Sequence, residues 1–155
     1  MTQLANYPSL KGKSVLVTGG ASGIGGITVE AFAAQGAHVA FLDRDVKNSA
    51  LVTEATGAPH ALCDFRNIPQ MQTAIAKLAD QMGPFSVLAN NAARDDRHNW
   101  QDVTPKYWDE RMDTNLRHMF FAIQAVAPAM IDMGGGSIIN LGSNSWWETV
   151  GGFPA

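Results

Sequence analysis

The chain has 155 residues, the length of one ordinary domain, of which 46% are apolar and 16% are charged. This composition is typical of a soluble globular domain with a buried core. No apolar run approaches the roughly 20 residues that cross a bilayer, so a membrane span is excluded. Eleven basic and fourteen acidic side chains leave no basic stripe for a phosphate backbone, so we do not expect nucleic acid as a partner.

The N-terminal residues, the single cysteine and the histidines bear on the compartment and on possible disulfide or metal sites. Residues 1–13 contain no long apolar stretch, so they do not resemble a secretory signal, and we expect a cytoplasmic protein. The single cysteine, Cys63, excludes an intramolecular disulfide and a zinc site built on a cysteine pair. The four histidines have no ligand spacing, so no metal site is predicted.

Short apolar runs alternate with helical periodicity along the chain. Strands are predicted at residues 14–18, 38–43, 60–64, 85–90 and 137–141. Helices are predicted at residues 24–35, 46–55, 68–82 and from Thr104 to the glycine cluster at 134–136. Strands that alternate with helices need right-handed crossovers, which place all five strands in one parallel sheet covered on both faces. The sequence therefore predicts a single α/β domain over residues 1–155.

Two details of the helices can be predicted as well. Apolar side chains recur on one side of two helices, at Ile27, Ala31 and Ala34 in one and at Met71, Ile75 and Leu78 in the other. The last helix contains Pro128, which removes one backbone hydrogen bond and should kink or loosen the final turns.

The segment TGGASGIG, residues 18–25, connects the first strand to the first helix. Free backbone N–H groups and the helix dipole attract an anion at such a corner, and glycines let a phosphate approach the backbone. The segment lacks the lysine of a P-loop, which argues against phosphoryl transfer. By itself, a tight turn that needs glycine for steric reasons explains the segment equally well.

Asp43 ends the second predicted strand, roughly 20 residues beyond the glycine segment. At this spacing in a dinucleotide-binding fold, a carboxylate can accept hydrogen bonds from the adenosine ribose. A carboxylate there would repel a 2′-phosphate, which favours NAD over NADP. Arg44 argues in the other direction, because an arginine can pair with that phosphate. Taken alone, Asp43 would be better explained as a solvated charge at a strand end.

Six features in this order resemble the short-chain dehydrogenase/reductase family. They are TGGASGIG at 18–25, Asp43, Cys63-Asp64, NNAA at 90–93, Asn115 and INLGS at 139–143. The family's usual NNAG is NNAA here, a change at a backbone-packing position. The resemblance implies a doubly wound parallel sheet, the Rossmann fold, with strand order 3-2-1-4-5 and a dinucleotide at the carboxyl ends of the strands.

The same resemblance implies roles for residues around the cofactor. Thr18 would brace the glycine loop. The pyrophosphate would be lined by Gly19, Ser22, Gly23, Ile24 and Gly25. Asp64 would accept a hydrogen bond from the adenine amino group, and Asn90 and Ala92 would meet the adenosine ribose and the neighbouring cofactor surface.

Two positions match catalytic residues of the family. Ser143 would donate a hydrogen bond to the reacting oxygen, and Asn115 would hold a water molecule in the proton relay. Without the family pattern, a turn at a strand end and a polar residue inside a helix are the better explanations of these two positions.

Longer runs are similar to bacterial NAD-dependent sugar 1-dehydrogenases of the family, which oxidise aldoses such as xylose to lactones. They are YPSLKGK at 7–13, DDRH at 95–98, YWDER at 107–111, NLRHM at 115–119, QAVAP at 124–128 and GSNSW at 142–146. This likeness implies a sugar substrate bordered by Trp146, Trp147 and the loop at 95–98, with Asp95, Asn144 and Trp146 as the candidate contacts. It also implies a homo-oligomeric enzyme, dimer or tetramer. Tryptophans that only pack and a loop that is only solvated are the alternative.

The family's catalytic tyrosine and lysine have no counterpart in the sequence. By the spacing of the motif, the tyrosine would occupy the position after Ala155. Tyrosine transfers the proton and the lysine lowers its pKa, so we expect a truncated enzyme whose C-terminal part is missing and which is inactive alone. The alternatives are a complete, non-catalytic dinucleotide-binding module and an NADPH-dependent 3-oxoacyl-thioester reductase, against which Asp43 counts.

Overall fold

The computed structural model describes residues 5–144 and residue 147. Its centre is a five-stranded parallel sheet with the order β3-β2-β1-β4-β5, which confirms the predicted order. The strands are β1 (Ser14–Thr18), β2 (His38–Asp43), β3 (His60–Leu62), β4 (Val87–Asn90) and β5 (Ser137–Asn140). The order reverses between β1 and β4, and in doubly wound sheets ligands bind at the carboxyl ends of the strands at such a reversal.

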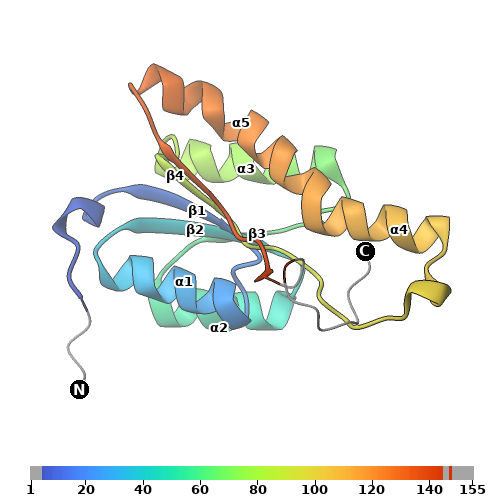
Figure 1. Cartoon of the computed structure of the whole chain (residues 1–155). Coiled ribbons are helices and arrows are strands. Elements are labelled where there is room, and N and C mark those ends of the chain that lie inside the picture. The colour runs from blue at the N-terminus through green and yellow to red at the C-terminus, as the bar shows by residue number, and fades with distance from the viewer. Residues whose placement is uncertain (1–4, 145–146, 148–155) are drawn as a thin grey trace.

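Helices cover both faces of the central strands, whereas all four residues of the edge strand β5 are exposed, so the predicted cover of all five strands on both faces does not extend to β5. The helices are α1 (Gly23–Ala34), α2 (Val46–Thr56), α3 (Ile68–Met82), α4 (Pro105–Met112) and α5 (His118–Asp132). Helices α1 and α2 lie on one face, and α3 and α5 lie on the other (Figure 1). The predicted doubly wound α/β fold is therefore confirmed. Within the described residues, no helix has both the length and the apolar character to cross a membrane.

The alternation of side chains along each strand divides the core into two parts. Leu16 packs with residues of α3 and α5, whereas Val15 and Val17 pack with residues of α1. On the α3 side, the predicted face is buried, at Met71, Ile75 and Leu78. The central strands are consequently buried on both faces, as a parallel sheet requires.

The buried side of α1 differs from the prediction. Ile27 is 67% exposed, and Ala31 and Ala34 are exposed too. Instead, Gly25, Gly26 and Val29 face the sheet. The reason is distance: a Cβ on Gly25 would lie 1.9 Å from the carbonyl oxygen of Gly19. The helix starts so close to the preceding loop that small residues, not the most apolar ones, occupy the buried side.

The predicted long helix after residue 104 is confirmed as an unbroken helical run from Pro105 to Asp132, with one irregular turn inside it. Helix α4 ends at Met112, a π-helical turn η3 (Asp113–Arg117) follows, and α5 begins at His118. Helix α5 then continues through Pro128 to Asp132. A π turn widens the backbone by one residue and changes which side chains share a face, which hydrophobic spacing does not reveal.

Several strands are shorter than predicted, and short 3-10 turns precede two of the main elements. β3 and β4 have 3 and 4 residues, shorter than the predicted 60–64 and 85–90. Two 3-10 turns, η1 (Pro8–Leu10) and η2 (Trp100–Asp102), precede β1 and α4. Helix α4 begins as predicted, because the Thr104 hydroxyl accepts a hydrogen bond from the Tyr107 N–H at 3.1 Å, with Pro105 in the first turn.

Candidate functional site

The candidate site is built from the carboxyl ends of the strands. In the register of the sheet, Thr18 of β1 lies beside Leu42 of β2 and Asn90 of β4, and Asn90 lies beside Asn140 of β5. The loops that leave these positions carry the residues singled out in the sequence. The fold therefore brings the predicted residues of β1, β2 and β4 to one edge of the sheet.

The glycine loop is held closely against its neighbours. Gly19 has φ +70°, and a Cβ at this position would lie 2.9 Å from the Cα of Ala92. The N–H groups of Gly19 and Gly20 both donate to the Leu42 carbonyl, at 2.8 and 3.2 Å. Only glycine satisfies the backbone angle and the contact at position 19 together.

The N-terminus of α1 is open. Ser22 occupies the N-cap but makes no side-chain hydrogen bond to the first turn. The first N–H of this turn that reaches a backbone carbonyl belongs to Gly26, at 3.1 Å from the Ser22 oxygen. A Cβ on Gly23 would meet nothing within 4 Å, and Ile24 is 68% exposed. Among the described residues, the N–H groups of Gly23, Ile24 and Gly25 have no acceptor, and open space in front of Gly23 leaves them accessible to an anion such as a phosphate.

Thr18 and Asn91 join the two loops at this corner. The Thr18 hydroxyl accepts hydrogen bonds from the N–H groups of Asn91 and Ala92, at 3.0 and 3.1 Å. The Asn91 side-chain amide donates to the carbonyls of Thr18 and Gly19, at 3.1 and 3.0 Å. Asn91 was not among the predicted site residues. The second asparagine of NNAA was the available signal, because a paired amide after a strand can satisfy the carbonyls of an adjacent loop.

Asn90 has a different environment from the one expected for a residue that meets the ribose. Its side chain is fully buried and donates from Nδ2 to the Asn140 Oδ1 at 2.8 Å, which links β4 to β5. Its backbone carbonyl accepts from the Leu141 N–H at 2.9 Å. Ala92 is 5% exposed and lies behind the glycine loop. Both residues support the loop from within the fold.

Asp43 points back at the glycine loop. Its Oδ2 accepts from the Ala21 N–H at 3.0 Å, and its Oδ1 accepts from the N–H groups of Arg44 and Asp45, at 2.7 and 3.0 Å. A carboxylate offers about four acceptor positions, so Oδ2 keeps one for another donor. Arg44 is exposed beside it. The carboxylate is therefore fixed at the corner and still able to accept a hydrogen bond.

Asp64 is committed to Arg66. The Arg66 guanidinium binds both carboxylate oxygens, and its backbone N–H donates to Oδ1 at 3.0 Å. These hydrogen bonds, followed by the charges of Arg66 and Arg44, hold the pKa of Asp64 below its usual range despite partial burial. Asp64 is thus a carboxylate whose acceptor positions are largely occupied by its own loop.

Asn115 holds the loop that follows β4. Its Oδ1 accepts from the Arg94 N–H at 2.8 Å, and its Nδ2 donates to the Arg94 carbonyl at 3.0 Å. The π turn η3 places the amide at this loop, so the residue acts on backbone groups through its side chain. Ser143 and Asn144 are exposed after β5, and Asp95 is exposed in the loop after β4. Trp146 lies outside the described residues.

The combination of an open helix N-terminus after β1, a carboxylate after β2 and an asparagine-rich loop after β4 agrees with the sequence comparison. The family described as short chain dehydrogenase matches residues 13–155, which is nearly the whole chain. The chain belongs to the short-chain dehydrogenase family. Its similarity to individual members of that family extends to sugar-oxidising enzymes.

Two curated relatives illustrate this similarity. D-xylose 1-dehydrogenase of Caulobacter vibrioides is 50% identical over 147 residues, which cover 92% of this chain and 58% of that protein. The probable galactose dehydrogenase of Rhizobium meliloti is 45% identical over 157 residues, which cover 97% of this chain and 61% of that protein. The short-chain dehydrogenase described here thus spans about three fifths of the length of these relatives.

A solved structure gives the same picture for the fold. Ligand-free aldohexose dehydrogenase of Thermoplasma acidophilum has a TM-score of 0.80 and 30% sequence identity to this chain. The match covers 89% of this chain and 52% of that structure.

Proposed function

We propose that this short-chain dehydrogenase binds NAD at the carboxyl edge of its sheet and takes part in the oxidation of an aldose to a lactone. The observation that carries the proposal is the uncapped N-terminus of α1 next to the fixed carboxylate of Asp43. A dinucleotide needs a place for its pyrophosphate and an acceptor for its ribose hydroxyls, and these two features supply both. Bound NAD would supply a hydride acceptor.

The residues of this chain would act on the cofactor as follows. The backbone of residues 22–25 binds the pyrophosphate, because its first N–H groups have no acceptor within the described part of the chain and Gly23 leaves the approach open. The remaining acceptor position on the Asp43 Oδ2 binds a ribose hydroxyl. The negative charge there disfavours a 2′-phosphate, so NAD is preferred over NADP.

The sugar assignment is supported by the relatives, whose names specify xylose, galactose and aldohexoses as substrates. In the proposed reaction, Ser143 donates a hydrogen bond to the sugar oxygen that loses its proton, and Asn115 orders the neighbouring loop and the proton path to solvent. Asp95, Asn144 and Trp146 border the sugar. A cytoplasmic location and a dimeric or tetrameric assembly belong to the same proposal.

The cofactor preference is tested by titrating the purified chain with NAD and NADP. Wild type should bind NAD at least about tenfold more tightly, because a hydrogen bond to a charged group contributes about 1.5–3 kcal/mol. Asp43→Asn should reduce this ratio by weakening NAD binding. Arg44→Gln is the matched variant at the neighbouring position and should weaken only NADP binding. Tighter binding of NADP than of NAD by the wild type would refute the cofactor assignment.

The reaction is tested by NADH formation with a panel of aldoses, using the polypeptide encoded by the whole reading frame. Turnover of at least one aldose, lost in Ser143→Ala, is expected. NADPH-dependent reduction of a 3-oxoacyl thioester without sugar oxidation would favour a reductase instead. Tight NAD binding without turnover of either substrate would identify a nucleotide-binding module.

A further inference from the structure

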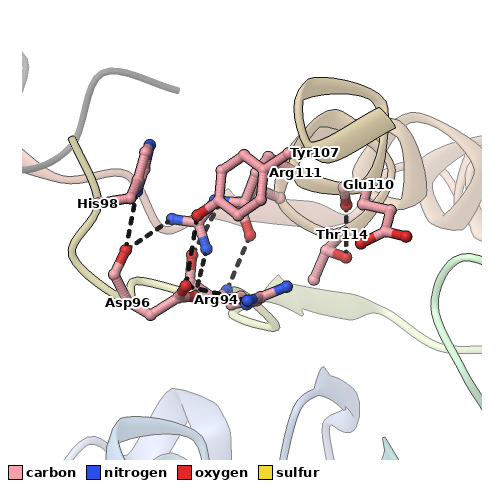
Figure 2. Close-up of polar contacts among 8 residues, drawn as sticks. Arg94, Asp96, His98, Tyr107, Glu110, Arg111 and Thr114 are labelled. Carbon is pink, nitrogen blue, oxygen red and sulfur yellow. Dashed lines mark hydrogen bonds and ion pairs between the residues drawn. The ribbon is translucent and has the colours of Figure 1, made fainter. Parts of the chain in front are cut away.

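The loop after β4 contacts α4 through every second side chain, at Arg94, Asp96 and His98. Arg94, Asp96 and His98 gather around Tyr107 and Arg111 of the helix, as Figure 2 shows. The Tyr107 hydroxyl donates to the Asp96 Oδ2 at 3.3 Å, and the rings of His98 and Tyr107 lie with their centroids 4.8 Å apart. This cluster is separate from the glycine loop and from Asp43.

Arg111 is the centre of the cluster. Its side chain is 1% exposed, and its Nη1 donates to the Asp96 Oδ1 at 2.7 Å. Its Nη2 also reaches the Asp96 backbone carbonyl at 3.4 Å. A buried guanidinium requires a counter-charge, and Asp96 is the one carboxylate bonded to it among the described residues. The loop backbone is therefore tied to the helix at residue 96.

A second cation completes the environment of Asp96. The Arg94 guanidinium binds the same carboxylate with both nitrogens of its fork. Arg94 and Arg111 each lie 5.7 Å from the centroid of the Tyr107 ring. The hydrogen bond from Arg94 and the charges of both arginines hold the pKa of Asp96 below its usual range. Asp96 therefore stays ionised at neutral pH.

These contacts fix the backbone on both sides of Asp95. On one side, Asn115 binds the N–H and the carbonyl of Arg94. On the other side, Arg111 binds the side chain and the carbonyl of Asp96. The exposed Asp95 therefore lies between two residues whose backbone is held by hydrogen bonds. These bonds restrict the backbone at Asp95 and so restrict the positions that its carboxylate can reach.

We propose that Asp96, through buried Arg111, is a positioning residue that orients the Asp95 segment and thereby sets the affinity for the sugar. This inference rests on the proposed function. Asp96 itself does not contact the sugar, because its carboxylate is used by two arginines and a tyrosine. Preorganisation of a binding loop raises affinity by reducing the ordering cost of binding.

The test compares variants of the polypeptide from the whole reading frame. Asp96→Asn should raise the KM for the aldose by about tenfold or more, with little change in kcat and in the Kd for NAD, because a small misplacement is costly. Amide hydrogen exchange of residues 95–97 should become faster in the same variant. Asp96→Glu keeps the negative charge, so its KM for the aldose should lie between the values of Asp96→Asn and wild type. Asp109→Asn is the control, because it removes an exposed carboxylate from α4, the helix to which the loop is bonded.

A second variant covers the case that Asp96→Asn fails to fold with an unpaired buried arginine. Asp96→Asn combined with Arg111→Met removes the buried charge as well as the anchor, and it should fold and show the raised KM. A KM within twofold of wild type in a folded variant would overturn the proposal. So would equal losses in NAD binding and sugar binding, which indicate a purely structural role. Absence of any aldose turnover by wild type would instead overturn the proposed function and this inference with it.

Discussion

The hydroxyl of Thr18 accepts a hydrogen bond from the Asn91 N–H at 3.0 Å, and the Asn91 amide donates to the Thr18 carbonyl at 3.1 Å. These two hydrogen bonds, both donated by Asn91, join the loops after β1 and β4, the two strands between which the sheet order reverses. The sheet edge proposed to bind the dinucleotide is therefore built on two loops that are hydrogen-bonded to each other and not only packed.

Removal of the Thr18 hydroxyl should weaken both the fold and the site. Thr18 is fully buried, so Thr18→Val leaves the N–H groups of Asn91 and Ala92 without an acceptor. We expect the free energy of unfolding to fall by about 1–3 kcal/mol, together with weaker NAD binding. Urea unfolding and NAD titration measure the two effects. Thr18→Ser keeps the hydroxyl and should retain most of the stability and most of the NAD affinity. Equal losses of stability and affinity in Thr18→Val and Thr18→Ser would contradict a role for the hydroxyl.

Two adjacent glycines of α1 should respond differently to alanine. A Cβ on Gly25 would lie 1.9 Å from the Gly19 oxygen and 2.4 Å from the Asn91 Nδ2. A Cβ on Gly26 would have its nearest neighbour at 3.7 Å. Gly25→Ala should therefore destabilise by about 1–3 kcal/mol or more and impair NAD binding. Gly26→Ala should be neutral or slightly stabilising, because alanine favours a helix by about 1 kcal/mol over glycine. Thermal unfolding of the pair decides the point.

His118 should make stability depend on pH. It is fully buried against Phe65, with ring centroids 5.1 Å apart, and neither ring nitrogen has a hydrogen-bond partner among the described residues. Burial is the main cause that lowers the pKa of His118, to about 4. As the pH falls, the unfolded chain, with a histidine pKa of about 6.5, binds a proton first. The free energy of unfolding should therefore be independent of His118 above about pH 6.5. It should fall progressively between about pH 6.5 and pH 4, by roughly 3 kcal/mol in total, because only the unfolded chain binds the proton in this range.

The measurement is the urea midpoint across this pH range. His118→Leu should flatten the part of the pH dependence that wild type shows between the two pKa values. His38, which is exposed on β2, provides the matched control as His38→Gln, and this variant should keep the wild-type slope. Identical slopes for wild type and His118→Leu would show that His118 does not titrate on unfolding.

Cys63 should be unreactive in the folded chain. It is 2% exposed, and burial, followed by the charges of Asp43 and Asp64, raises the pKa of its thiol to about 12. The thiolate is the reactive form, so disulfide-exchange reagents at neutral pH should modify Cys63 only after unfolding. Modification followed with and without urea tests this. Rapid reaction of the native protein, at the rate of the unfolded chain, would contradict the burial.

Much of the fold follows from local sequence signals. The strand β1 ends where the apolar run meets Gly19, and α3 runs from the Asn67 cap to Gly83, as the sequence predicted. Burial on both faces requires continuous apolar strands, while caps and glycines mark helix ends, so these elements are encoded within a few residues. The alternation of strands and helices predicts a parallel sheet, which places the residues after β1 and β2, Thr18 and Asp43 among them, at one edge. The strand order itself was implied by the family resemblance, because the same alternation is compatible with more than one doubly wound order.

The tertiary structure alone decided which side chains meet. It buried Gly25 instead of Ile27, because close approach of the helix to the loop outweighs apolar character. It directed Asn90 to β5 and gave the loop contacts to Asn91, since hydrogen bonds across strands depend on register and not on neighbours in sequence. The amino-acid sequence determined the elements and the corner at which an anion can bind. The placement of Asp96 on buried Arg111, 15 residues further along the chain, depends on how the loop after β4 packs on α4, and no local pattern encodes that contact.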